Sequence, residues 1–427
     1  MTAPRHSIVH RDVHAYCAHP HVVRAADGAL VAVFNKAPRR SIVLHPPEDP
    51  MFQNMLIRST DEGETWSTPE PVPGYNHTGM ECAGLTALRD GRLLLNQWQF
   101  DWLPAGRVQA LADPSAYTDA GNLLARWGRS PEHDTAGADL AALRRETPWA
   151  RGPGRCLVHV STDHGKSFGD TVTVDTAPFS GGYGMRGAVE TADGRILLPL
   201  SDVPLYRAVF IVESRDGGQS WGRPQPVASG AGHAFEEPAI LRGQGDRLVL
   251  VLRDNITRRL HQCISPDGGQ GWGPPTPLPV TGYPAALLRL ADQRILLTYG
   301  WRQPGYGIRA VYSQDDGATW RTDQTVLIRD DLPNRNLGYP VTHECADGTL
   351  LTLYYGEDPD GVTVIFATRW HPTGPVPRTP RRTDPGKPVR QAPVLSSMDD
   401  SFSRPGRPVI IGHHEVPRSP GGPPPSR

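Results

Sequence analysis

Residues able to bind or protonate a substrate recur at equivalent places along the chain, beside short apolar alternations. Six polar sites precede these alternations: His19-Pro20, Glu81-Cys82, Arg186-Gly187, Glu236-Glu237-Pro238, Tyr283-Pro284 and Tyr339-Pro340. A second set follows them: Asn35, Trp98, Asp202, Arg253, Tyr299 and Tyr355. A core does not require carboxylate, phenol, imidazole and guanidinium groups at these places. The set therefore predicts a polar binding site.

The elements that must position these residues are short hairpins. An apolar alternation, an Asp-Gly-like turn and a second apolar run occur in His21–Phe34 and Gly84–Leu95. The pattern returns around Asp193-Gly194, Asp246, Asp292 and Asp347-Gly348. Alternating apolar residues on both sides of a two-residue turn predict a β-hairpin.

An octet of the form S-x-D-x-G-x-[ST]-W alternates with the hairpins. It occurs five times, at Ser59–Trp66, Ser161–Phe168, Ser214–Trp221, Ser265–Trp272 and Ser313–Trp320, with small departures. The Asp and Ser side chains can bond turn amides, Gly allows a positive φ, and the aromatic residue packs beneath. Six hairpins and five octets predict six units of about four strands. We therefore expect an all-β, six-bladed β-propeller over residues 1–371.

The ends of the chain and one long spacing complete this prediction. The third strand of the last blade is expected at Val362–Trp370, with Ser7–His10 closing the ring as the fourth. Octets are about 50 residues apart except between Ser59 and Ser161, so residues 100–154 are expected to be an insertion in blade two. That insertion includes a helix-like stretch at Asp139–Glu146. Residues 372–427 contain 14 of the 44 prolines and are expected to be disordered.

Composition excludes several functions. The 44 basic and 45 acidic residues nearly cancel, which argues against nucleic acid and anionic lipid as partners. No apolar run is long enough for a membrane span. Five scattered cysteines predict free thiols, and Met1–Pro20 has no apolar run of signal-peptide length. We therefore expect a cytoplasmic protein. The sequence gives no signal for a cofactor or a metal site and does not indicate the oligomeric state.

The five octets are those known as Asp-boxes in the sialidase superfamily, and the chain from about residue 6 to 370 resembles that superfamily. The resemblance implies a glycosidase for terminal acidic sugars, such as a small sialic-acid glycoside or oligosaccharide. Sialidases bind the sugar carboxylate with three arginines and use a tyrosine nucleophile, which a glutamate activates. An aspartate serves as acid and base. The boxes themselves are expected to be turn elements without catalytic roles.

Carried over by position, the resemblance implies a role for several residues. Tyr339 corresponds to the nucleophile and Glu237 to its base, with Glu236 as an alternative functional carboxylate. Asp49, between the first hairpin and the first box, corresponds to the acid/base residue, although it could instead be a turn residue.

Arginines that would bind the substrate carboxylate are implied in the same way. Arg253 corresponds to the second arginine, and Arg309 to the third, with Arg302 as its rival. Glu357 corresponds to a glutamate that holds the first arginine. Glu81 and Tyr283 complete the expected substrate-binding set.

Blade one departs from the family pattern and leaves other functions open. The first arginine is missing, and His19 stands in its place, so Arg186 would have to replace that arginine in a sialidase. A rim histidine with Tyr339 could instead act in a lyase or glycosidase for uronic-acid oligosaccharides, since neutral histidine abstracts protons near pH 7. In that case Met80-Glu81 and Met185-Arg186 would also matter. A non-catalytic propeller that binds glycans or proteins is the third possibility.

Overall fold

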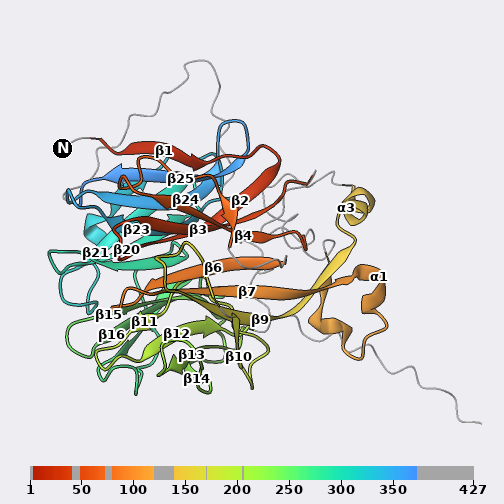
Figure 1. The fold of residues 1–427 in the computed structure, drawn as a ribbon, viewed down its shortest axis with the longest axis horizontal. Coiled ribbons are helices and arrows are strands. Elements are labelled where there is room, and N and C mark those ends of the chain that lie inside the picture. Colours follow the sequence, from red (N-terminus) through yellow and green to blue (C-terminus); the bar gives the residue numbers. More distant parts are fainter. Residues whose placement is uncertain are drawn as a thin grey trace, which may run out of the picture.

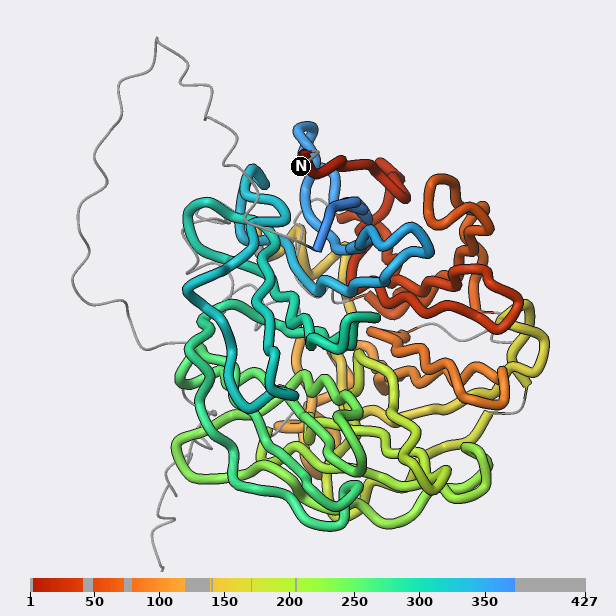
Figure 2. Tube along the Cα trace, turned by 90° about the vertical axis from the view of Figure 1, so that its left-hand side faces the viewer, coloured from red at the N-terminus to blue at the C-terminus, as the bar shows by residue number. Residues whose placement is uncertain are grey.

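The fold is a ring of six antiparallel sheets, as the repeats predict. The computed structural model describes residues 3–40, 49–72, 79–119, 139–169, 171–203 and 206–372. In that part of the chain the strands form six sheets, each a blade of the propeller. Figure 2 shows the chain passing around the ring, so that its red first segments lie beside its blue last ones. The expected all-β, six-bladed architecture is confirmed.

The blades follow the order of the chain, with one exception at the closure (Figure 1). Blade one consists of β2 (Ala15–Arg24), β3 (Leu30–Pro38), β4 (Gln53–Ser59) and β5 (Glu70–Pro71). Blade two consists of β6 (Met80–Ala87), β7 (Leu93–Pro104), β9 (Trp149–Ser161) and β10 (Thr171–Val174), with β8 (Thr118–Asp119) beside β9. Blade three consists of β11 (Val189–Glu190), β12 (Ile196–Ser201), β13 (Ala208–Ser214) and β14 (Gln225–Ser229).

The other three blades contain the remaining strands. Blade four consists of β15 (Phe235–Arg242), β16 (Leu248–Asp254), β17 (Arg259–Ser265) and β18 (Thr276–Pro277). Blade five consists of β19 (Ala285–Arg289), β20 (Ile295–Trp301), β21 (Gly307–Ser313) and β22 (Val326–Arg329). Blade six consists of β23 (Gly338–Glu344), β24 (Leu350–Glu357), β25 (Thr363–Trp370) and β1 (Arg5–His10). Because β1 pairs antiparallel with β25, the N-terminal strand closes the ring, as expected.

The Asp-boxes are tight turns held by their own side chains. In the first box Ser59 Oγ donates to Asp61 Oδ1 at 2.7 Å and accepts from Gly63 N at 2.8 Å. Asp61 also accepts from the amide and hydroxyl of Thr65. The fourth box has Gly271 where the others have Ser or Thr, so this position donates to Asp267 through its backbone amide and offers no hydroxyl. These bonds account fully for the repeated residues, which supports a structural role for the boxes.

The core lies between neighbouring blades. Val31 and Val33 of blade one belong to the same buried cluster as Leu85 and Leu93 of blade two. Another buried cluster joins Phe34 of blade one, Leu94 of blade two and Leu353 of blade six, so the core continues from blade to blade. All five cysteines are buried free thiols, as predicted.

The segment expected to be an insertion begins as a continuation of the two central strands of blade two. β7 and β9 stay paired as far as Pro104 and Trp149, and α1 (Ala105–Val108), the 3-10 turn Pro114–Ala116 and α3 (Leu140–Glu146) follow or precede them (Figure 1). Asp139 caps α3 by accepting from Ala141 N at 2.9 Å. A further 3-10 turn spans Thr322–Gln324. The proline-rich segment 373–427 lies outside the described residues. No helix in the described ranges is long and apolar enough to cross a membrane.

Candidate active site

The site is built by a backbone irregularity that repeats in the first strand of four blades. His19, Cys82, Glu237 and Tyr339 have φ values of 53°, 52°, 54° and 54°. In each blade the register of strand pairing shifts at this residue. A positive φ strains a residue that has a side chain, and a bulge redirects that side chain out of the regular alternation. The bulges turn these four side chains toward one another, so that residues of different blades lie close together.

Tyr339 and Glu237 form the central pair. The Tyr339 hydroxyl donates to Glu237 Oε1, although the residues are 102 positions apart and belong to blades six and four. Both are buried, with 4% and 3% of their surface exposed. Burial and the neighbouring Glu237 charge raise the pKa of Tyr339 well above its usual value. The phenol is therefore neutral at rest, and a carboxylate is placed to accept its proton.

Arg253 holds two carboxylates next to that phenol. Its Nη1 donates to Glu237 Oε2 at 3.0 Å and lies 3.3 Å from Glu236 Oε1. Burial opposes ionisation of Glu237, but Arg253 and the bond from Tyr339 keep its pKa below the usual value. Burial raises the pKa of Glu236 to about 7, although Arg253 opposes the rise. Glu237 is thus the carboxylate suited to act as a base, and Glu236 is the one that takes up a proton more readily.

A second arginine, Arg302, faces the same phenol from blade five. Its guanidinium carbon lies 5.6 Å from the centre of the Tyr339 ring and 5.7 Å from that of Tyr283. It donates to Leu337 O at 3.0 Å and to the Tyr355 hydroxyl at 3.2 Å. The guanidinium carbon of Arg253 also lies over the Tyr283 ring, 4.2 Å from its centre. Two guanidiniums therefore flank Tyr339.

Arg186 differs from these two arginines because its guanidinium bonds to the backbone of two other blades. Only 4% of its surface is exposed, and it donates to two backbone oxygens, Ala285 O at 3.2 Å and Pro340 O at 3.0 Å. These bonds connect blade three to blades five and six. Burial lowers the pKa of Arg186 to about 10, so it remains charged at neutral pH. Arg186 is thus a buried positive charge that connects three blades through hydrogen bonds to their backbone.

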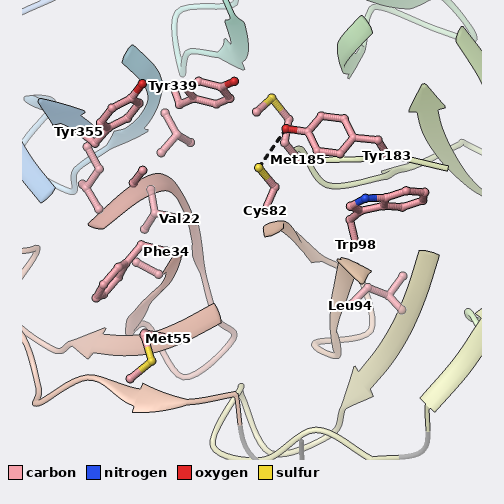
Figure 3. Packing of buried hydrophobic residues seen from close by; sticks show 14 of the residues in the cluster. Val22, Phe34, Met55, Cys82, Leu94, Trp98, Tyr183, Met185, Tyr339 and Tyr355 are labelled. Carbon is pink, nitrogen blue, oxygen red and sulfur yellow. Dashed lines mark hydrogen bonds between the residues drawn. The ribbon is translucent and has the colours of Figure 1, made fainter. Parts of the chain in front are cut away.

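His19 lies against the nucleophile candidate. Its ring contacts that of Tyr339 edge-on, with centroids 4.1 Å apart, and lies 5.6 Å from that of Tyr355. Atoms of His19, Glu81 and Cys82 that could bind a metal lie within 4.8 Å of one another. The Cys82 thiol contacts the Tyr183 hydroxyl at 3.0 Å, and Figure 3 shows this contact opposite the Tyr339 and Tyr355 rings.

The other predicted residues have contacts away from this pair. Asp49 pairs with Arg40, whose Nε lies 2.7 Å from its Oδ2, and accepts from Met51 N at 2.9 Å. Arg309 lies over the Trp301 ring, 3.6 Å from its centre. Of the two arginines considered for the third position, Arg302 is the one that faces Tyr339.

Glu357 accepts hydrogen bonds from two asparagines. Asn334 Nδ2 and Asn336 Nδ2 each lie 2.7 Å from one of its oxygens. The Tyr16 hydroxyl donates to Asn336 Oδ1 at 3.1 Å, which extends the network toward Tyr355. In the family pattern Glu357 would pair with the first arginine. In this chain its carboxylate accepts hydrogen bonds from the side-chain amides of Asn334 and Asn336 instead.

Among the residues that the structure describes, two sets of side chains have metal-ligand types, but neither is well suited to an ion. Burial raises the pKa of the Cys82 thiol well above normal, so it stays protonated beside His19 and Glu81. The second set is His233, Asp254 and His261. Asp254 already accepts from Ala234 N, Ile256 N, Thr257 Oγ1 and His233 Nδ1. Its lone pairs are therefore occupied.

Sequence reasoning missed two neighbours of the site. Arg151, from the extended part of β9, donates to Glu81 Oε2 at 3.3 Å and lies 4.4 Å from the Phe100 ring centre. Asn255 Nδ2 donates to Glu236 Oε1 at 2.6 Å. Asn255 directly follows the strand-ending pair Arg253-Asp254 and could have been found by extending that set. Nothing in the local sequence of Arg151 signals its position.

Comparison with known proteins agrees with this fold. Residues 146–352 match the BNR repeat-like domain family. A sialidase from Bacteroides fragilis is 23% identical over 368 residues, which span 78% of this chain and 59% of that protein. A protein of unknown function from Dyadobacter fermentans has a TM-score of 0.70 at 23% identity, over 87% of this chain and 100% of that one.

Solved sialidases share the architecture at lower identity. A mutant of the NanB sialidase from Streptococcus pneumoniae aligns with a TM-score of 0.61 and 13% identity, over 85% of this chain and 70% of that one. At such identities the structural likeness concerns the fold. Together with the five Asp-boxes and the domain match, it supports a relationship to the sialidase-like superfamily of BNR-repeat proteins.

Proposed function

We propose that the protein is an exo-glycosidase that hydrolyses terminal acidic sugars of the sialic-acid type. The observation that carries the proposal is the hydrogen bond from the Tyr339 phenol to the Glu237 carboxylate, with Arg253 and Arg302 on either side. A phenol beside a base is suited to nucleophilic attack near an anionic substrate, because it carries no charge of its own before the reaction. A module that only binds glycans would not need this pair.

Local charge favours an acidic substrate. Arg186, Arg253 and Arg302 contribute three positive charges, whereas Glu237 is the carboxylate whose ionised form its neighbours favour. Guanidinium charges gathered at the site attract an anion. A sugar carboxylate could accept from Arg253 and Arg302, since guanidinium groups match carboxylates in shape and charge.

The chemical steps follow from this geometry. Glu237 accepts the Tyr339 proton as the phenol oxygen attacks the anomeric carbon, and the bond from that carbon to the leaving oxygen breaks. The departing oxygen requires a proton. Asp49 remains the residue that the family resemblance suggests for this step, and Glu236 is an alternative because its pKa of about 7 keeps part of it protonated. Water, deprotonated by the same acid/base residue, then attacks the anomeric carbon and breaks its bond to Tyr339. Glu237 returns its proton to the departing Tyr339 oxygen, which restores the phenol and the carboxylate.

The test is turnover of a fluorogenic sialoside by the wild-type protein and by Glu237→Gln. The proposal expects wild-type hydrolysis and a loss of about 10²–10⁴-fold without the base. Absence of wild-type turnover with sialosides and with other terminal acidic sugars would refute it. Thermal unfolding of both proteins would show whether the variant is folded.

One observation favours a second function. Burial lowers the pKa of His19 to about 4, so the imidazole is neutral and in contact with Tyr339. A neutral imidazole and a phenol could remove the proton next to a uronic acid carboxylate and protonate the leaving oxygen, which is β-elimination. This reaction forms a conjugated double bond that absorbs ultraviolet light, whereas hydrolysis does not. Uronic-acid oligosaccharides assayed in this way distinguish the two functions.

A further inference from the structure

A chain of buried side-chain amides runs from the site into blade two. His19 Nδ1 lies 2.7 Å from Asn35 Oδ1, Asn35 Nδ2 donates to Asn54 Oδ1, and Asn54 Nδ2 donates to Gln97 Oε1 at 2.7 Å. Gln97 Nε2 lies 3.0 Å from His159 Nε2, at the far end. All five residues are at least 97% buried. The proposed catalytic steps use none of the three amides.

The backbone of Cys82 fixes the direction of this chain. A backbone N–H can only donate, and that of Cys82 lies 3.0 Å from Asn35 Oδ1. A backbone carbonyl can only accept, and that of Cys82 lies 3.4 Å from Asn54 Nδ2. The bulge at Cys82 thus orients both amides independently of either histidine. Asn35 presents its oxygen to His19, and Asn54 presents its nitrogen to Gln97.

We infer that Asn35 and Asn54 are positioning residues that fix His19 as the neutral tautomer protonated on Nδ1, with the lone pair on Nε2. Because the Asn35 oxygen cannot donate, the short contact to His19 requires a proton on Nδ1. The same direction makes His159 accept on Nε2, so its proton lies on Nδ1, toward Thr171 Oγ1 at 3.3 Å. Both histidines at the ends of the chain thereby have one defined tautomer.

The charges around His19 act in opposite directions. Burial opposes a second proton on the ring and outweighs every other influence on its pKa. The hydrogen bond to Asn35 and the charge of Glu237 favour the protonated ring, whereas Arg302 and Arg186 oppose it. Glu81 also lies close to the ring. A second proton on His19 would therefore add a cation to a site that already holds several arginines. Asn35 accepts a hydrogen bond from the ring but, unlike a carboxylate, brings no negative charge to the site.

The consequence for the substrate rests on the proposed function. A fixed, neutral imidazole cannot replace the missing arginine as a cation. It provides an acceptor beside Tyr339, so it suits a neighbouring hydroxyl or amide N–H and not a carboxylate. Arg253 and Arg302 would then bind the substrate carboxylate. His19, in blade one, would accept a hydrogen bond from an uncharged group of the substrate.

The experiment is nitrogen-15 NMR of the histidine side chains in the wild-type protein, without substrate, from pH 5 to 9. A protonated and an unprotonated ring nitrogen have widely separated shifts, and the His19 signals are identified by their loss in His19→Gln. The inference expects Nδ1 protonated and Nε2 unprotonated throughout. A proton on Nε2, or a charged ring at neutral pH, would overturn it whether or not the protein is a glycosidase.

A matched pair of variants tests the role of Asn35. Asn35→Leu keeps the side-chain size but removes the acceptor, so His19 should change to a mixture of tautomers. Asn96→Leu is the control, because Asn96 is also a buried strand asparagine but donates to Gly184 O and is outside the chain of amides. Unchanged His19 shifts in folded Asn35→Leu would refute the assignment. If that variant does not fold, the wild-type spectrum remains decisive.

Discussion

Replacing Arg253 by methionine should shift the pH range of the proposed glycosidase activity. Arg253 contacts both Glu237 and Glu236, and it is the charge that keeps Glu237 ionised against burial. Methionine has a similar length without the charge. In Arg253→Met the pKa of Glu237 should rise, so the base will be protonated at a higher pH than in the wild type.

The size of the effect follows from the geometry. Opposite unit charges 3.0 Å apart attract by about 5 kcal/mol at an effective dielectric constant of about 20. At about 1.36 kcal/mol per unit, this would be an upper limit of about 4 pKa units. The charge centres are farther apart than the contacting atoms, and Glu236 shares the same guanidinium. We therefore expect a rise of about 1–2 units.

The assay is kcat/KM for a fluorogenic acidic glycoside from pH 4 to 9. Activity that needs ionised Glu237 falls as pH decreases through its pKa, so the acidic limb should move upward in Arg253→Met. Loss of a charged hydrogen bond to the substrate, about 1.5–3 kcal/mol, should lower the plateau by a further ~10- to ~150-fold.

Arg294→Met is the matched control. Arg294 also pairs with a carboxylate, Asp292 at 2.6 Å, and lies over a phenol ring, that of Tyr312 at 4.5 Å, but it does so at a hairpin turn. It should keep the wild-type profile. An acidic limb that stays in place in folded Arg253→Met would refute the assignment of Glu237 as the base.

Three other predictions concern separate parts of the molecule. Gly271→Ser should stabilise the protein by about 0.5–1 kcal/mol in urea unfolding, since it restores the box hydroxyl toward Asp267, and a loss of stability would contradict that role. His19→Gln, which retains a donor and an acceptor, should exceed His19→Leu in kcat/KM at least ~10-fold; equal values would count against a role for hydrogen bonding. The Thr65 hydroxyl helps lower the pKa of Asp61 to about 2, below its unfolded value, so this stabilisation is present above about pH 4 and is lost as pH falls through about 2. Urea unfolding of Thr65→Val between pH 2 and 5 should therefore depend less on pH, and the wild-type slope would refute the argument.

Much of the fold was predictable because its signals are local and repeated. Each Asp-box has its bonding partners within one octet, so the sequence alone predicts the turn. The hairpin patterns then gave the blades, and Ser7–His10 was expected at the closure because the last unit lacked a strand. The pair Tyr339 and Glu237 could be expected from the family resemblance, and the structure brings them into contact.

What could not be predicted depends on side-chain direction. Arg186, Arg302 and Arg309 were all candidates for binding the substrate carboxylate, but Arg186 donates to backbone oxygens, Arg302 faces Tyr339 and Arg309 lies on Trp301. The bulges at Cys82 and Glu237 break the two-residue alternation that sequence patterns assume. A register shift of one residue reverses the face of a side chain, so position along the strand does not determine its direction.

The central claim, that Tyr339 is the nucleophile and Glu237 its base, is most directly tested by looking for the covalent intermediate. The wild-type protein would be mixed with a reactive fluorogenic sialoside, quenched in acid within one turnover, digested and analysed by mass spectrometry. We predict a glycosyl group on the peptide that contains Tyr339, and none on that peptide from Tyr339→Phe. Turnover without any adduct, or an adduct on another residue, would contradict the account.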